Sequence, residues 1–237
     1  MRRRIAMLTV GGLLAAAALI PLLAGGPEAA ASIDPANFSS PKANPYFPLR
    51  PGTTFVYRGH ESGDHLLERM TVTSKTKTIV GVQTVVVRDV MWANGVLDEK
   101  TTDWYQADNN GSVWYFGEAT ATYKPNGEVE SREGSWQAGR DGAVAGVIMP
   151  ANPHPTDAYR QEFRKGHAED QAWIVQNHLA IRAPIGRVDD VVRSFEWTRL
   201  EPHVVSVKFY APHLGIVREQ DVAGGTEFME LVAVHHG

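Results

Sequence analysis

The chain has 237 residues, a net charge of −4, 43% hydrophobic residues and 21% charged residues. These proportions supply enough apolar side chains for one or two packed cores, and they exclude a disordered or nucleic-acid-coating protein. The absence of cysteine excludes disulfide frameworks, thiolate zinc sites and thiol nucleophiles, together with the lipid-bearing cysteine of a bacterial lipoprotein.

The first 31 residues have the pattern of a secretory signal. Arg2, Arg3 and Arg4 precede an apolar stretch over residues 5–24, and Ala29-Ala30-Ala31 supplies a small-residue cleavage site. We expect cleavage after residue 31. The alternative is an uncleaved membrane anchor, because about 20 apolar residues can just span a bilayer. Both interpretations place the rest of the chain outside the cytoplasm, secreted or in the cell envelope.

Removal of residues 1–31 takes away three arginines and one glutamate, so 20 basic and 26 acidic residues remain and the net charge becomes −6. Phosphate backbones and anionic lipid surfaces repel such a domain. We therefore expect no nucleic-acid partner, and membrane contact only through an uncleaved signal anchor.

Beyond the signal, residues 32–45 are rich in Pro, Ser and Asn, which predicts a flexible tether. From residue 46 on, apolar and polar residues alternate, and β-branched and aromatic side chains are frequent. The predicted strands cover residues 53–58, 66–78, 84–92, 101–106 and 112–116. Glycine-containing turns separate them, including Asp108-Asn109-Asn110-Gly111, which lacks the carboxylate spacing of an EF-hand calcium loop. This order predicts an antiparallel meander.

Residues 157–177 are open to two interpretations. They lack proline and carry several acidic residues, which favours a helix. Gly166 interrupts that pattern, however, and the alternation of Tyr159, Gln161 and Phe163 before it resumes after it at Trp173. We therefore predict two strands around Gly166.

A comparison of the chain with itself reveals a match at a shift near 104 residues. Pro48, Pro51, Thr54, Tyr57 and Arg58 align with Pro150, Pro153, Thr156, Tyr159 and Arg160, and Gly81, Val86, Val87, Arg88 and Trp92 align with Gly186, Val191, Val192, Arg193 and Trp197. The match predicts an internal duplication, with one β repeat over 46–139 and a second over 147–237; chance strand periodicity is the alternative. The predicted fold is all-β: an antiparallel meander of two pseudo-repeats, arranged as a curved sheet or half-barrel, or as two packed small sheets.

Two segments carry a family resemblance. Pro51-Gly52-Thr53-Thr54-Phe55 at the start and Tyr210-Ala211-Pro212-His213-Leu214-Gly215-Ile216-Val217 near the end resemble a broad group of uncharacterised secreted bacterial β-proteins. The chain is also distantly similar to LolA-like curved sheets, which carry lipids or lipoproteins. These resemblances imply an extracytoplasmic location and a β fold, and they imply no activity.

Histidines and carboxylates in two predicted turns are candidates for a metal site. They are His60, Asp64 and His65 in the first repeat and His167 and Glu169 in the second. If the two turns faced each other, imidazole and carboxylate groups could converge on zinc. The alternative is two solvated polar turns. The pair His235-His236 predicts a frayed C-terminal tail.

Aromatic residues concentrate on the later strands of each repeat, together with one aligned arginine in each. The candidate ligand-binding residues are Arg88, Trp92, Trp104, Trp114, Arg193, Trp197 and Tyr210. Such side chains can line a concave apolar pocket, and they can equally fill a core.

The sequence contains no Gly-x-Ser-x-Gly elbow, phosphate-binding glycine loop or dinucleotide fingerprint. We therefore predict a secreted, non-catalytic binding protein for an apolar or amphipathic ligand, such as a hydrophobic small molecule or lipid, or for a cell-envelope component, with no cofactor. The alternatives are an extracytoplasmic hydrolase, with zinc as its cofactor if it is metal-dependent, and a structural envelope interaction module.

Overall fold

The computed structural model describes residues 33–237, so the predicted signal at 1–31 lies outside the described residues. The elements in chain order are η1 (Pro35–Phe38), β1 (Thr53–Glu61), β2 (Asp64–Ile79), β3 (Val82–Ala93), β4 (Val96–Ala107), β5 (Val113–Tyr123), β6 (Val129–Ser131), β7 (Trp136–Gln137), β8 (Val144–Met149), β9 (Ala158–Arg160), β10 (Glu162–Phe163), β11 (Asp170–Ala183), β12 (Gly186–Thr198), β13 (Val205–Ala211), β14 (Gly215–Ala223) and β15 (Phe228–His236). Within this part of the chain, no helix is long and apolar enough to cross a membrane.

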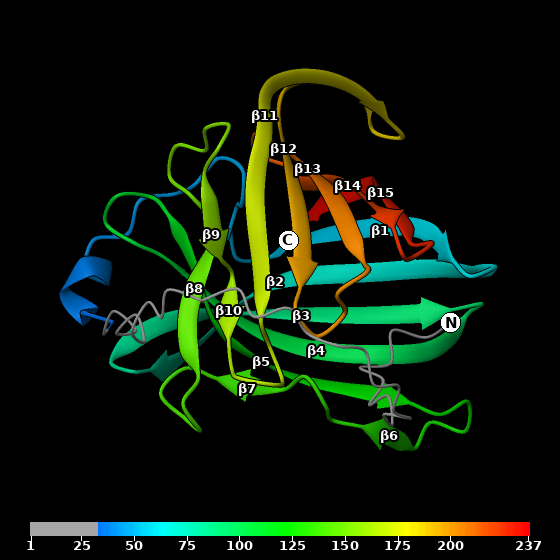
Figure 1. Cartoon of the computed structure of the whole chain (residues 1–237), viewed down its shortest axis with the longest axis horizontal. Helices are drawn as coiled ribbons and strands as arrows, with labels where there is room; N and C mark the ends of the chain where they lie inside the picture. Colours follow the sequence, from blue (N-terminus) through cyan, green and yellow to red (C-terminus); the bar gives the residue numbers. More distant parts are fainter. Residues whose placement is uncertain (1–32) are drawn as a thin grey trace, which may run out of the picture.

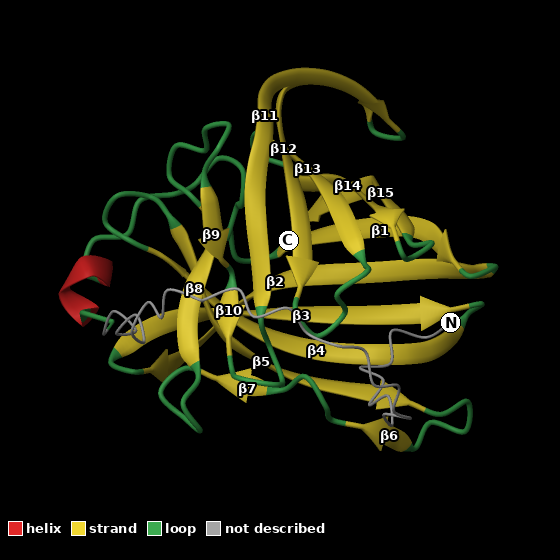
Figure 2. Cartoon of the chain, viewed as in Figure 1, coloured by secondary structure: helices red, strands yellow, loops and turns green. Residues whose placement is uncertain are grey.

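One antiparallel sheet contains all of these strands, in the order β10-β8-β5-β4-β3-β2-β1-β15-β14-β13-β12-β11-β9, with β6 and β7 added beside β5. Figure 1 shows β2 to β5 running across the picture and β11 to β14 standing upright in front of them. Figure 2 shows the same arrangement as almost continuous strand and turn, with η1 as its single helical segment in residues 33–237. The predicted all-β meander is confirmed as one curved sheet, and the alternative of two packed small sheets is wrong.

The first and last strands of the meander are partners. β1 pairs with β15 over most of its length, with Thr53 opposite His236 and His60 opposite Phe228. The predicted frayed tail is therefore wrong, because residues 235 and 236 belong to a strand, and the Nδ1 atom of His236 lies 3.3 Å from the hydroxyl oxygen of Thr53. This pairing joins the first and last strands at the middle of the sheet.

The sheet curls until its two ends meet at a single seam. Strand β9 pairs with β11 at one end of the sheet, β10 pairs with β8 at the other, and only Gln161 separates β9 from β10 along the chain. The backbone N–H of Gln161 donates to the carbonyl oxygen of Asp170 at 2.8 Å. Gly146 on β8 lies so close that a Cβ atom there would be 2.4 Å from the carbonyl oxygen of Arg160. A glycine thus allows the two ends of the sheet to approach.

Substitution at this seam gives a direct test. Gly146→Ala places a methyl group against backbone atoms that cannot move aside, so we expect a loss of about 3 kcal/mol in the free energy of unfolding. Gly142→Ala is the matched control, because Gly142 has a positive φ of 74° but faces open space, and only backbone strain of about 1 kcal/mol applies. Urea denaturation measures both variants, and equal losses would contradict the close approach at the seam.

Residues 33–45 are part of the fold, so the prediction of a flexible tether is wrong. The ring of Phe38 is buried and packs edge-on against Trp114 and Phe116, with centroid separations of 6.0 and 5.5 Å. The side-chain amide of Asn44 donates to the carbonyl oxygens of Gly111 and Pro150 at 2.8 and 2.9 Å. The ring of Phe38 and the side-chain amide of Asn44 thus help to fix residues 33–45, although the composition of this segment is typical of a linker.

The turn between β4 and β5 is held by one carboxylate. Oδ1 of Asp108 accepts hydrogen bonds from the backbone N–H groups of residues 110, 111 and 112 at 2.8–2.9 Å, and Oδ2 accepts from the indole of Trp114 at 3.1 Å. Gly111 has a φ of 101°, which favours glycine. The predicted hairpin turn is confirmed, and both oxygens of this carboxylate accept hydrogen bonds from the protein.

Residues aligned by the self-comparison occupy corresponding hairpins. Gly81 lies at the β2–β3 turn and Gly186 at the β11–β12 turn, with φ values of 82° and 115°. Arg88 and Arg193 follow on β3 and β12. Strand β8 extends across the predicted start of the second repeat at residue 147 and pairs with β5 of the first. The duplication itself stays a prediction.

The two strands expected around Gly166 are confirmed. Strands β9 and β10 precede this glycine and β11 follows it, and Gly166 lies in the turn with a φ of 74°. The alternating pattern therefore outweighs the helix-like composition of this segment.

Candidate functional site

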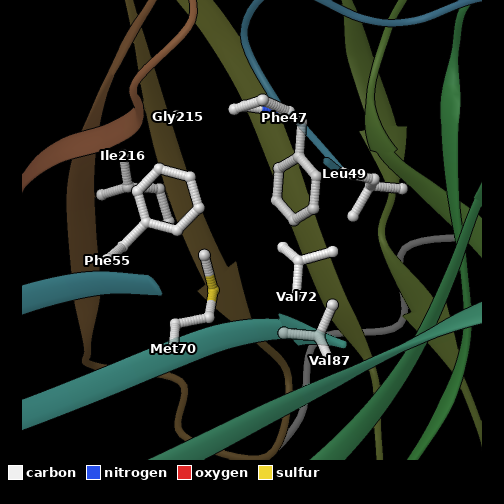
Figure 3. Close-up of a pocket in the computed structure, with 9 residues that line it drawn as sticks. Phe47, Leu49, Phe55, Met70, Val72, Val87, Gly215 and Ile216 are labelled. Carbon is white, nitrogen blue, oxygen red and sulfur yellow. The ribbon is translucent and has the colours of Figure 1, made fainter. Parts of the chain in front are cut away.

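The interior of the curled sheet is filled by its own side chains. Phe55 and Tyr57 of β1, Tyr210 of β13 and Leu231 of β15 are almost completely buried. The cavity among Phe47, Phe55, Met70, Val72, Val87 and Ile216 has a volume of about 10 Å³, close to the space that one water molecule needs. Figure 3 shows these side chains converging from several strands. This cavity cannot take a ligand larger than water.

A buried ion-pair network connects the strands of the second half. Lys208 of β13 lies 3.3 Å from a carboxylate oxygen of Glu196 and 3.4 Å from one of Glu219. Glu196 also accepts hydrogen bonds from Tyr210, Ser194 and Gln161 at 2.7, 2.8 and 3.0 Å. Burial opposes ionisation of Glu196, but Lys208 and these donors hold its pKa below the usual range. Hydrogen bonds and ion pairs join the groups of this network, which links β12 and β13 to Gln161 at the seam.

Four carboxyl groups on the opposite wall lie inside the sheet with raised pKa values. Burial is the main cause for all of them, and neighbouring carboxylates add to it: Glu68 for Asp89, Asp103 for Glu118, and Asp170 for Glu162. For Asp103, burial raises the pKa to about 7, although a hydrogen bond of 2.7 Å from the hydroxyl of Tyr115 acts in the other direction. These groups hold protons more tightly in the folded protein than in the unfolded chain.

The pH dependence of stability follows from this. A carboxyl group with a raised folded-state pKa binds a proton more tightly when folded, so its contribution is most favourable in acid and declines as the pH rises. For Asp103 the decline falls between about pH 4 and about pH 7. We expect Asp103→Asn to flatten the fall in unfolding free energy over this range, as measured by urea denaturation at a series of pH values. Glu133→Gln, at an exposed position, is the control, and an unchanged pH profile for Asp103→Asn would contradict the assignment.

The outer face of the sheet carries an open groove of about 630 Å³ across β15, β1 and β2. Thr54, Val56 and Arg58 of β1 alternate with the buried Phe55 and Tyr57, so they point away from the core. The groove is lined by Thr54, Val56, Arg58, Arg69, Val232, Ala233 and His235. We call this set the outer groove.

Strand register sets the pattern of the outer groove. Val56 is opposite Ala233 on one side and Arg69 on the other, so aliphatic groups form its middle. His235 is opposite Thr54, at one end. Arg58 lies two residues further along β1, at the other end. The result is an aliphatic floor between basic side chains, which suits a ligand with both an apolar and an anionic part.

The structure does not bring the seven predicted ligand-binding residues together. Arg88 and Trp92 lie on β3, and Arg193 and Trp197 lie on β12, in opposite halves of the sheet. Trp104 is buried beneath Lys77, whose Nζ atom is 3.3 Å from the ring centroid.

The remaining two have structural contacts. Trp114 packs against Phe38 and hydrogen-bonds to Asp108, and Tyr210 donates to Glu196 in the interior. Trp92 adjoins the outer groove, because the centroid of its ring lies 5.6 Å from the guanidinium carbon of Arg69, which lines the groove.

Three of the five candidate metal ligands have other partners. The ring of His60 stacks on Phe228 at 5.4 Å, and Asp64 accepts a hydrogen bond from the side chain of Asn94 at 2.7 Å. Oε1 of Glu169 accepts from the backbone N–H of Gly166, while His65 is opposite His60 across β1 and β2. His167 lies in the turn before β11. Over residues 33–237, no three His, Asp or Glu side chains are grouped so that they could hold a metal ion.

Sequence reasoning missed the residues of the outer groove. Arg58, Arg69 and His235 are each exposed and each precede or follow a less exposed residue, which marks an outward position on a strand. No local signal connects them, because β1 and β15 are paired across almost the whole described chain. Only the strand register brings them together.

Comparisons with known proteins add a distant likeness in fold. No family model and no curated protein matches the chain. A candidate exported protein with a YmcC-like fold from Bacteroides fragilis is 14% identical, with a TM-score of 0.47, over 81% of this chain and 100% of its own. A candidate lipoprotein from Parabacteroides distasonis is also 14% identical, with a TM-score of 0.44, over 82% of this chain and 100% of its own.

Proposed function

We propose that the protein is an extracytoplasmic, non-catalytic binding protein that holds an amphipathic ligand in the outer groove. The observation that carries the proposal is the contrast between the two spaces: about 10 Å³ inside the sheet and about 630 Å³ in the outer groove. The second volume is in the range of small-molecule sites in proteins. The signal-like residues 1–31 support the location.

The chemistry of the outer groove favours binding over catalysis. Its lining consists of aliphatic side chains, one threonine, two arginines and one histidine. A catalytic base such as histidine is commonly oriented by a carboxylate, and no carboxylate lines the outer groove beside His235. Aliphatic groups beside cations instead provide two complementary contacts for an amphipathic molecule.

Native mass spectrometry of protein purified from its own host tests the proposal. We expect a retained ligand on the wild-type chain, and its loss from Ala233→Trp, because an indole on the half-buried Ala233 fills the floor of the outer groove. Ala180→Trp is the matched control, since Ala180 is exposed on β11 outside the groove and its variant should keep the ligand.

Two outcomes would overturn the proposal. A bare protein mass in all three samples would favour a structural interaction module. A mass that includes zinc would favour the metal-dependent hydrolase.

A further inference from the structure

Four cations on the neighbouring strands β1 to β4 form a zigzag across the outer face of the sheet. Arg69 lies opposite Val56, which is two residues from Arg58, and Arg88 lies opposite Thr71, which is two residues from Arg69. Lys100 is in turn opposite Val90, two residues from Arg88. Each cation is therefore the diagonal neighbour of the next, at about 7 to 8 Å in an antiparallel sheet. We call Arg58, Arg69, Arg88 and Lys100 the cation track.

The cation track forms no ion pairs among the described residues. Within residues 33–237, no ion pair connects any of its four members to a carboxylate. Glu230 is opposite Arg58 on β15, but Arg218 already holds that carboxylate with a contact of 2.7 Å. The direct cross-strand neighbours of the track are mainly valine, leucine and threonine.

Aromatic rings keep two of these side chains on the sheet surface. The guanidinium of Arg69 lies over Trp92, and the ammonium of Lys100 lies 5.3 Å from the ring centroid of Tyr123. Cation–π contacts order a side chain without neutralising its charge. The track is thus an arranged positive surface on a chain whose total charge is −4.

Like charges on neighbouring strands repel each other, and an anion bound between them offsets this unfavourable electrostatic energy. Arginine is well suited to phosphate, because its planar guanidinium donates two parallel hydrogen bonds. Arg58 and Arg69 of the track also line the outer groove, so phosphate and aliphatic contacts are adjacent.

We propose that the ligand of the outer groove is an anionic phospholipid, whose phosphate lies between Arg58 and Arg69 and whose acyl chain covers Val56 and Ala233. This inference rests on the proposed binding function. Arg88 and Lys100 extend the positive potential beyond the groove and attract the anionic headgroup. The net negative charge of the whole chain opposes general adsorption to anionic surfaces, so binding is confined to this face.

Titration with short-chain lipids tests the inference. Dihexanoylphosphatidylglycerol and dihexanoylphosphatidylcholine are used below their micelle concentrations, so that both remain monomeric, and binding is followed by isothermal titration calorimetry. We expect the anionic lipid to bind the wild-type chain about tenfold more tightly than the zwitterionic one, because both carry the phosphate but the cation track repels the choline cation of the zwitterionic lipid. The double variant Arg58→Gln/Arg69→Gln should lose this preference and bind both lipids equally.

The control removes the same positive charge elsewhere. Arg132→Gln/Lys165→Gln changes two exposed residues outside the outer groove, so it should keep the preference for the anionic lipid. All variants carry the same residues 1–32, so any lipid binding by that segment is common to them. Circular dichroism and urea denaturation establish that the variants retain the fold, as expected for exposed side chains.

The possible results separate the two proposals. Equal binding of both lipids by the wild-type chain would overturn the anionic phospholipid and leave the amphipathic groove standing. Binding of glycerol 3-phosphate as tight as that of the anionic lipid would assign the site to a free phosphate ester and also overturn the inference. If neither lipid binds, the inference fails, and a ligand retained in native mass spectrometry and lost in Ala233→Trp would still support the proposed function.

Discussion

Among residues 33–237 no layer of helices covers the sheet, and this constraint determines the rest of the described structure. A strand exposes side chains on both faces, so each wall of a curled sheet must cover the inner face of the other. Large residues such as Phe55, Phe116 and Tyr210 fill the interior. The cavity inside the sheet holds no more than about one water molecule, whereas the outer groove, at about 630 Å³, is large enough for a small molecule.

Charge is divided between the two faces of the sheet. The inner face of β2 to β5 carries carboxyl groups whose burial raises their pKa values, as for Asp89 and Glu118. The outer face of the same strands carries the cation track. Alternation along each strand produces this division, since successive residues point to opposite faces. A single net charge for the chain therefore conceals carboxyl groups on the inner face of these strands and the cation track on their outer face.

The sequence was sufficient to predict the class of the fold, but insufficient to locate the groove. Alternation and glycine turns are local signals, so the strands and the hairpins at Gly81 and Gly111 could be predicted. The anchoring of residues 33–45 could not, because it depends on where one ring, Phe38, finds a partner more than 70 residues away. The aromatic residues predicted to form a binding site lie apart in the structure. Each strand has an inner and an outer face, and the sequence does not show which of the two meets solvent.

The pairing of β1 with β15 also determines when the outer groove can exist. Val56 and Ala233 form its floor, yet they are far apart in the chain and become neighbours only after the last strand has been synthesised. Contacts between such distant residues form slowly, because a long loop must close first. During synthesis, β1 has one partner, β2, and its other edge stays open. An incomplete chain therefore has no assembled groove, so the proposed ligand binding would require that folding has reached the C-terminal strand.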